Sequence, residues 1–249
     1  MELADVLDSK SSGSDTVRVR PPLPAPNNEG QVLPVLCCFC TLNKRHWDKG
    51  RDMDKNRFEK QIRFILEADK EKNIFRQTHI GGNTRRENDA EHAWHMAMMI
   101  YLLKEYANEE IDVAKAMMMA LIHDIVEIDA GDTYCYDAGS LETQKEREEK
   151  AAERIFGLLP EEQKNELQSL FYEFENYSTP EARFARAMDN FQPLILINSN
   201  NGDDWKKRGI CKSQVVNRHS KTALGSEEIG KYSMKIIEEN TRNGNLKDI

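Results

Sequence analysis

The pair His123-Asp124 lies inside the long apolar segment Ala114–Ile128, with Glu127 three residues after the aspartate. Burying an imidazole beside a carboxylate costs free energy unless something compensates both groups. A divalent metal ion does so, since it accepts a neutral imidazole and a carboxylate as ligands. The alternative is a salt-bridged pair at the end of a core helix, because most buried polar groups are simply hydrogen-bonded.

Two further polar residues in apolar surroundings extend this pair. His92 is expected in the first turn of a helix whose later residues are mostly apolar, and Asp189 lies beside the apolar stripe of the segment Pro180–Ile197. Two imidazoles and two carboxylates form a set suited to Mn, Fe, Co, Ni or Zn rather than to a thiolate-bound structural zinc. The sequence therefore predicts one divalent transition-metal site formed by His92, His123, Asp124 and Asp189.

The order of these residues resembles the HD superfamily of metal-dependent phosphohydrolases, whose signature is H…HD…D. The likeness is closer to its 5′-deoxynucleotidase-like branch and extends over roughly residues 56–240. Three segments carry it: Arg85–His92, His123–Asp132 and Ala187–Asn190. The pattern R-x-E-x-x-x-E-H before the first histidine and E-x-x-x-G-D after HD make it specific. The resemblance implies an all-α fold, a compact multi-helix HD-domain bundle.

Two acidic residues after the HD pair are the predicted catalytic residues. Glu127, expected one turn after His123 on the same helix face, matches the catalytic glutamate of the family and is the candidate general acid or base. A helix-terminal acid paired with a basic residue is the alternative. Asp132 is expected in a loop after Gly131, where it would bind a sugar hydroxyl or assist proton transfer, although aspartate after glycine is also ordinary in turns.

The predicted substrate contacts are Arg76, Gln77, Arg85 and Arg86. The resemblance implies that Arg76 reaches the substrate phosphate, which a guanidinium group binds well through paired donors. Arg85 and Arg86 flank the entry to the helix of His92. The family pattern has a tryptophan after the first arginine, which we associate with exclusion of a 2′-hydroxyl, whereas this chain has Gln77. Deoxyribonucleotides and ribonucleotides therefore both stay open as substrates.

Hydrolysis of a phosphomonoester is the reaction that this set serves most naturally. A bound divalent ion lowers the pKa of its water and withdraws charge from phosphorus. We therefore expect release of phosphate from (deoxy)nucleoside 5′-monophosphates by a metal-activated water. Two alternatives stay open: another HD enzyme, such as a phosphodiesterase or guanosine-polyphosphate hydrolase, and a non-catalytic helical metal-binding protein. The presence of Glu127 and Asp132 beside all four ligands argues against the last.

The composition bounds the partners of the protein. The 249 residues carry a formal net charge of −8, which argues against a dedicated nucleic-acid or anionic-membrane binder. No apolar stretch approaches the roughly 18 residues that span a bilayer, and no secretory signal is visible, so a reducing, cytoplasmic location is expected. Five cysteines form no disulfide framework, and the cluster Cys37–Cys40 lacks the further ligands of a structural zinc site. The expected partner is a small phosphorylated molecule, with a homodimer left open.

The composition of the chain changes near residue 53. Residues 1–52 are rich in Ser, Gly, Pro and Asn and are predicted to be a disordered N-terminal extension, followed by an HD phosphohydrolase domain over residues 53–249. Pro193 is expected to bend its helix, residues 198–224 form a variable stretch, and no strand series is predicted. The expected helices are one with the inward stripe Phe58, Ile62, Ile65 and Leu66, one bearing His92, a central helix Ile111–Ile128, an outer helix Glu142–Phe156, helices starting at Pro160 and at Ser178–Pro180, and a last one near Ser226–Asn240.

Overall fold

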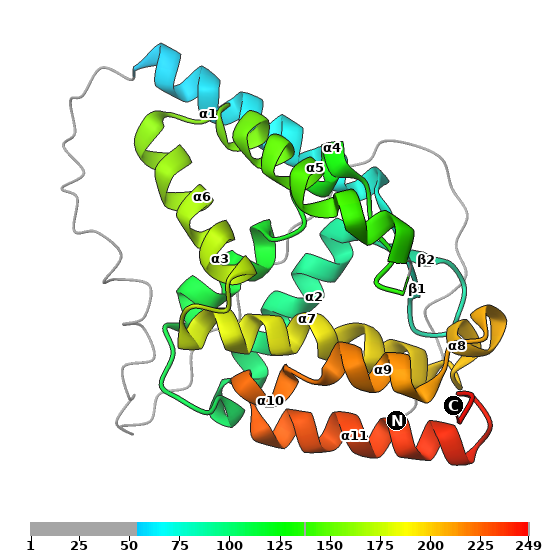
Figure 1. Ribbon diagram of the computed structural model, residues 1–249. Coiled ribbons are helices and arrows are strands. Elements are labelled where there is room, and N and C mark those ends of the chain that lie inside the picture. The colour runs from blue at the N-terminus through cyan, green and yellow to red at the C-terminus, as the bar shows by residue number, and fades with distance from the viewer. Residues whose placement is uncertain (1–53, 137, 249) are drawn as a thin grey trace, which may run out of the picture. The chain divides into compact units, whose positions relative to one another are not determined.

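The computed structural model describes residues 54–136 and 138–248, and over this part of the chain it confirms the all-α fold (Figure 1). The predicted extension, residues 1–52, lies outside the described residues. The α-helices are α1 (Lys55–Ala68), α2 (Asp89–Leu103), α3 (Val113–Ile122), α4 (Glu127–Ala130), α5 (Ala138–Phe156), α6 (Glu161–Glu175), α7 (Pro180–Ser199), α8 (Asp203–Arg208), α9 (Lys212–His219), α10 (Thr222–Gly225) and α11 (Glu227–Arg242). The other described elements are the 3₁₀ helices η1 (Asp69–Asn73) and η2 (Lys104–Tyr106) and the strands β1 (Phe75–His79) and β2 (Arg86–Asn88).

Helix α7 is the element around which the others pack. Thr179 caps its amino terminus by accepting a hydrogen bond from the backbone N–H of Ala182, and Pro180 occupies the first turn, where its missing N–H costs nothing. Helices α2, α3, α6, α10 and α11 contact it, and Figure 1 shows it crossing the middle of the described domain with α11 alongside. It continues as one helix through Pro193 to Ser199. Among the described residues, no helix has the length and apolar character of a membrane span.

Two hydrophobic clusters form the core, and the HD pair lies where they meet. The larger cluster joins α2, α3, α7 and α11 and contains Met119 and Ala120 near the end of α3. The smaller cluster joins α5 and α6, and it also takes in Ile122, Ile125 and Val126. The end of α3 thus reaches the larger cluster through Met119 and Ala120, whereas Ile122 and Ile125, on either side of His123-Asp124, belong to the smaller one. The pair is therefore held where the two clusters meet.

The predicted central helix Ile111–Ile128 is wrong at its carboxyl end, since α3 ends at Ile122. The next backbone hydrogen bonds join residues three apart, from Ile125 N to Ile122 O at 3.3 Å and from Glu127 N to Asp124 O at 2.8 Å. These tight turns lead into α4, so Glu127 does not share a helix face with His123. An apolar run that is buried on both sides resembles a continuous core helix in sequence, and this explains the error.

Helix α1 forms as predicted, but the face expected to be buried remains exposed. Phe58, Ile62, Ile65 and Leu66 are all solvent-exposed. The helix instead contacts its neighbours through the adjacent stripe, in which Phe64 stacks on Phe156 of α5 with ring centroids 6.4 Å apart. Helix α1 lies against α5 and η1 at one edge of the domain, so a narrow contact face is enough to hold it.

A short antiparallel hairpin, which the sequence did not predict, carries the four candidate substrate residues: Arg76 and Gln77 on one strand, Arg86 on the other and Arg85 in the connection. Strands β1 and β2 pair Phe75 with Asn88 and His79 with Arg86. The hairpin is tied to the end of α7 and to α8, because Asn200 Oδ1 accepts from the Gly82 N–H at 3.1 Å and Asp204 Oδ1 lies 2.7 Å from His79 Nδ1. The stretch expected to be variable thus contains three short helices, one of which fixes this hairpin.

Candidate metal centre

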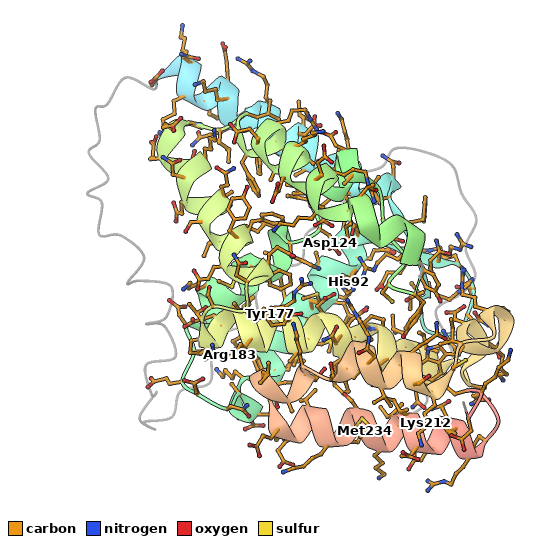
Figure 2. All side chains as sticks on the ribbon, viewed as in Figure 1. His92, Asp124, Tyr177, Arg183, Lys212 and Met234 are labelled. Atoms are coloured by element: carbon orange, nitrogen blue, oxygen red, sulfur yellow. The ribbon has the colours of Figure 1, made fainter. Side chains whose placement is uncertain are left out.

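The four predicted metal ligands converge on one buried point. His92 lies in the first turn of α2, His123 and Asp124 directly follow α3, and Asp189 lies on α7. Figure 2 shows His92 and Asp124 close together inside the domain. His92 Nε2 lies 3.3 Å from Asp189 Oδ1 and 3.9 Å from Asp124 Oδ2. His123 Nε2 lies 3.0 Å from Asp124 Oδ2 and 3.8 Å from Asp189 Oδ1. Ligand atoms about 2.1 Å from one octahedral ion lie about 3.0 to 4.2 Å apart, a range that includes these four distances. The donor atoms of His92, His123 and Asp189 all lie within 4.8 Å of one another, and Asp124 forms a second such group with Asp89 and Glu127.

The chemistry of the donors also suits a metal ion. His123 Nε2 is buried and has no well-oriented hydrogen-bond partner among the described residues, although carboxylate oxygens lie near it. The other ring nitrogen, Nδ1, lies 2.8 Å from the carbonyl oxygen of Ala120 and donates to it. In the neutral ring Nε2 therefore carries the lone pair that a metal ligand requires.

Arginines keep the two aspartates of the centre ionised. Burial alone would raise the pKa of Asp189, but Arg218 and the two histidines hold that pKa well below its usual value. Arg186 and Arg218 both donate to Asp189 Oδ2, at 3.2 Å and 3.1 Å, which leaves Oδ1 beside the histidines. Against the same effect of burial, His123 and Arg76 lower the pKa of Asp124.

The pKa values of the two histidines shift in opposite directions. Burial lowers the pKa of His92 to about 4, so this ring is neutral at physiological pH. Burial also acts on His123, but Asp124 and Asp189 outweigh it and raise the pKa of that ring to about 10. The carboxylates therefore attract positive charge to the place where the four donors meet, and a divalent cation provides that charge in place of a proton.

A cavity of about 590 Å³ opens beside the centre, and both predicted catalytic residues line it. Glu127 is buried, and its burial together with the neighbouring Asp124 and Asp89 raises its pKa well above the usual value. Burial also raises the pKa of Asp132, against the opposing effect of Arg76. Gly131 precedes Asp132 with φ of 75°, a left-handed conformation that glycine adopts freely and that lets the chain turn after α4.

The structure brings two of the four predicted substrate contacts to the cavity. Arg76 lines it and donates from Nη1 to Asp89 Oδ1 at 3.2 Å and to Asp124 Oδ2 at 2.5 Å. Gln77 lines it as well, and its Oε1 accepts from Arg208 of α8. Arg85 instead forms two hydrogen bonds with Glu91, at 2.7 Å and 2.6 Å, and Arg86 is exposed; neither lines the cavity.

Several residues of the site were missed by the sequence analysis. Arg186, three residues before Asp189 on α7, has the spacing of a helical ion pair and could have been found from it. Arg218 and Arg208 belong to short helices in the stretch expected to be variable, where no periodic pattern indicated their direction. Arg208 lies over the ring of Tyr134, 4.8 Å from its centroid, and both line the cavity.

Comparison with known proteins finds relatives that are named 5′-deoxynucleotidases. The 5′-deoxynucleotidase HDDC2 of Homo sapiens is 32% identical over 111 residues, which cover 45% of this chain and 53% of that protein. The 5′-deoxynucleotidase HDDC2 of Dictyostelium discoideum is 33% identical over 114 residues, or 44% of this chain and 60% of that protein. The chain thus spans about half the length of the curated relatives it matches.

A solved structure covers more of the chain. The crystal structure of a predicted metal-dependent phosphohydrolase from Magnetospirillum magnetotacticum MS-1 is 43% identical in sequence and superposes with a TM-score of 0.75, over 79% of this chain and 98% of the other. The family model for the HD domain matches residues 68–230, which include all four converging donors. The chain therefore belongs to the HD domain family.

Proposed function

We propose that this chain is a metal-dependent phosphohydrolase that releases phosphate from nucleoside 5′-monophosphates. The observation that carries the proposal is the position of three of the metal donors, His123, Asp124 and Asp189, in the wall of a cavity. The same wall contains Arg76, Glu127 and Asp132. A cavity of about 590 Å³ is within the range of sites for small organic ligands. The names of the relatives, 5′-deoxynucleotidase and metal-dependent phosphohydrolase, support the same class of reaction.

The residues that would hold the ion are His92, His123, Asp124 and Asp189. Their N/O donors suit Mn, Co, Fe, Ni or Zn. When bound, the ion supplies a Lewis acid for a phosphoryl oxygen and a water of lowered pKa. The remaining contributions come from side chains of the cavity wall.

Arg76 is the candidate phosphate ligand. Its guanidinium group lies against Asp124, one of the metal donors, so a phosphate that contacts the ion would also come within its reach. A guanidinium group can offer two parallel N–H donors to phosphate oxygens. Asp89 accepts from the same guanidinium and keeps it directed toward the centre.

Glu127 is the candidate general acid. Burial and the neighbouring carboxylates raise its pKa, which favours the protonated carboxyl group that a proton donor to the leaving ester oxygen requires. Asp132, on the same cavity wall, would accept a hydrogen bond from a sugar hydroxyl. Gln77, Arg208 and Tyr134 offer polar and aromatic contacts for the rest of the nucleotide.

The first test is a substrate panel with the purified chain. With Co²⁺ or Mn²⁺ added, we expect inorganic phosphate to be released from deoxyribonucleoside or ribonucleoside 5′-monophosphates, and the release to stop when a chelator is added. The panel also contains cyclic nucleotides and guanosine polyphosphates. Hydrolysis of either of these at ten times the monophosphate rate would reject the proposed substrate class, and metal binding without any turnover would indicate a non-catalytic protein.

The second test separates metal binding from chemistry. Glu127→Gln removes the transferable proton but keeps the size of the side chain, so kcat should fall by about 10²-fold or more while the metal content is retained. Glu148→Gln is the matched control, since Glu148 lines the same cavity and burial also raises its pKa, yet it is not among the proposed catalytic groups. Equal losses in the two variants, or loss of metal from Glu127→Gln, would contradict the assignment.

The third test concerns the arginines. Arg76→Ala should raise KM for nucleoside monophosphates by tenfold or more, because a charged phosphate contact is lost, and should leave inhibition by unphosphorylated nucleosides unchanged. Arg85→Ala should leave KM within about twofold, because an exposed pair such as Arg85–Glu91 contributes little. If the two variants have equal KM values, Arg76 does not bind the phosphate.

A further inference from the structure

Gln192 is a buried amide on the helix that carries Asp189. It lies three residues after Asp189 on α7, so both side chains project from the same side of that helix, and its exposed fraction is 0%. A buried primary amide needs hydrogen-bond partners for its two N–H groups and its oxygen. The partners that Gln192 uses are all close to the metal centre.

The amide nitrogen and the amide oxygen of Gln192 contact different residues. Nε2 donates to Glu87 Oε1 at 2.6 Å and lies 3.0 Å from His95 Nδ1. Oε1 lies 2.9 Å from His92 Nδ1. Burial raises the pKa of Glu87 to about 7. In its ionised form this carboxylate accepts but does not donate, so it binds the N–H end of the amide and directs the oxygen toward His92.

This orientation fixes the tautomer of His92. An amide oxygen can only accept, so the hydrogen bond at 2.9 Å requires a proton on His92 Nδ1. In the neutral ring the other nitrogen, Nε2, then has a free lone pair, and it lies 3.3 Å from Asp189 Oδ1 among the other donors. At His123 the corresponding acceptor for Nδ1 is a backbone carbonyl, that of Ala120.

We propose that Gln192 is a positioning residue for the metal centre, which holds His92 in the Nδ1–H tautomer and aims Nε2 at the ion. The inference rests on the proposed metal centre but is independent of the proposed substrate. Residues that orient a metal-ligating histidine typically contribute 10-fold to 100-fold in metal affinity. Gln192 lies outside the H…HD…D signature, and its role is visible only from contacts between residues far apart in the chain.

The test compares the affinity of the full chain for Co²⁺, measured by competition with a chelator, among variants of the Gln192–Glu87 pair. Gln192→Met keeps a similar volume without the hydrogen bonds, and Kd should rise by about 10-fold to 100-fold. The double variant Glu87→Gln with Gln192→Glu exchanges amide and carboxylate, and so keeps an acceptor for His92 Nδ1. It should bring Kd back to within about fivefold of the unmodified chain.

A second readout reports the tautomer directly. Nitrogen NMR of the histidine rings in the metal-free chain at neutral pH should show His92 protonated at Nδ1, and this form should decline in Gln192→Met. Asn240→Leu is the control for the loss of a buried amide, since Asn240 is buried on α11 and hydrogen-bonds with Asn198 and Asn245, neither of which is a metal donor. It should lower Tm without changing Kd.

Three results would overturn the inference. They are an unchanged Kd in Gln192→Met, a His92 protonated at Nε2 in the metal-free chain, and a rise in Kd that Asn240→Leu reproduces. A chain that binds Co²⁺ with the expected response to these variants but does not hydrolyse nucleotides would refute the proposed function and leave the role of Gln192 intact. A chain that binds no Co²⁺ at all would refute both.

Discussion

The free-energy cost of keeping His123 and Asp124 away from water determines much of the structure around them. The pair lies at the junction of two hydrophobic clusters. Met119 and Ala120 before it belong to the larger cluster, and Ile125 and Val126 after it belong to the smaller. Ionisable groups in such a place need partners of opposite charge or a metal ion. The surrounding helices supply these partners, and in doing so they bring residues from four distant segments to one point.

Asp189 and the two histidines each use one side-chain atom for a supporting hydrogen bond and direct another toward the centre. One oxygen of Asp189 accepts from two arginines, while the other lies beside the histidines. One nitrogen of each histidine is hydrogen-bonded, to a backbone carbonyl at His123 and to a side-chain amide at His92. Asp189 and the two histidines therefore each direct one donor atom toward the centre, which reduces the reorganisation needed when an ion binds. Asp124 differs, since its Oδ2 accepts from Arg76.

That His92, His123 and Asp189 lie close together could be predicted from the sequence, because each is a polar residue in an apolar context and such residues are rare without a reason. The path of the backbone through His123 and Asp124 could not be predicted from the sequence. The run from Ala114 to Ile128 is apolar throughout, and apolar content does not distinguish a helix from turns that are buried on both sides.

Contacts between distant segments account for the other differences. Arg76 and Arg85 were both predicted to contact the substrate. In the structure Arg85 pairs with Glu91 on the surface, whereas Arg76 on strand β1 contacts Asp124 at the centre. Arg218 reaches the centre from a short helix without a periodic pattern. Gln192 lies on α7, whose apolar stripe was recognised, but its contact with His92 joins residues 100 positions apart. The contact face of α1 was likewise predicted wrongly. Helix α5 packs against Phe64, whereas the stripe that begins at Phe58 remains exposed.

The claim that two imidazoles and two carboxylates hold one ion is tested most directly by X-ray absorption spectroscopy of the Co²⁺-loaded chain. The account predicts a coordination shell of only nitrogen and oxygen atoms at about 2.1 Å, with the scattering pattern of two imidazole rings. The pattern should fall to one ring in His123→Ala. A sulfur atom at about 2.3 Å, or a shell without imidazole, would contradict it.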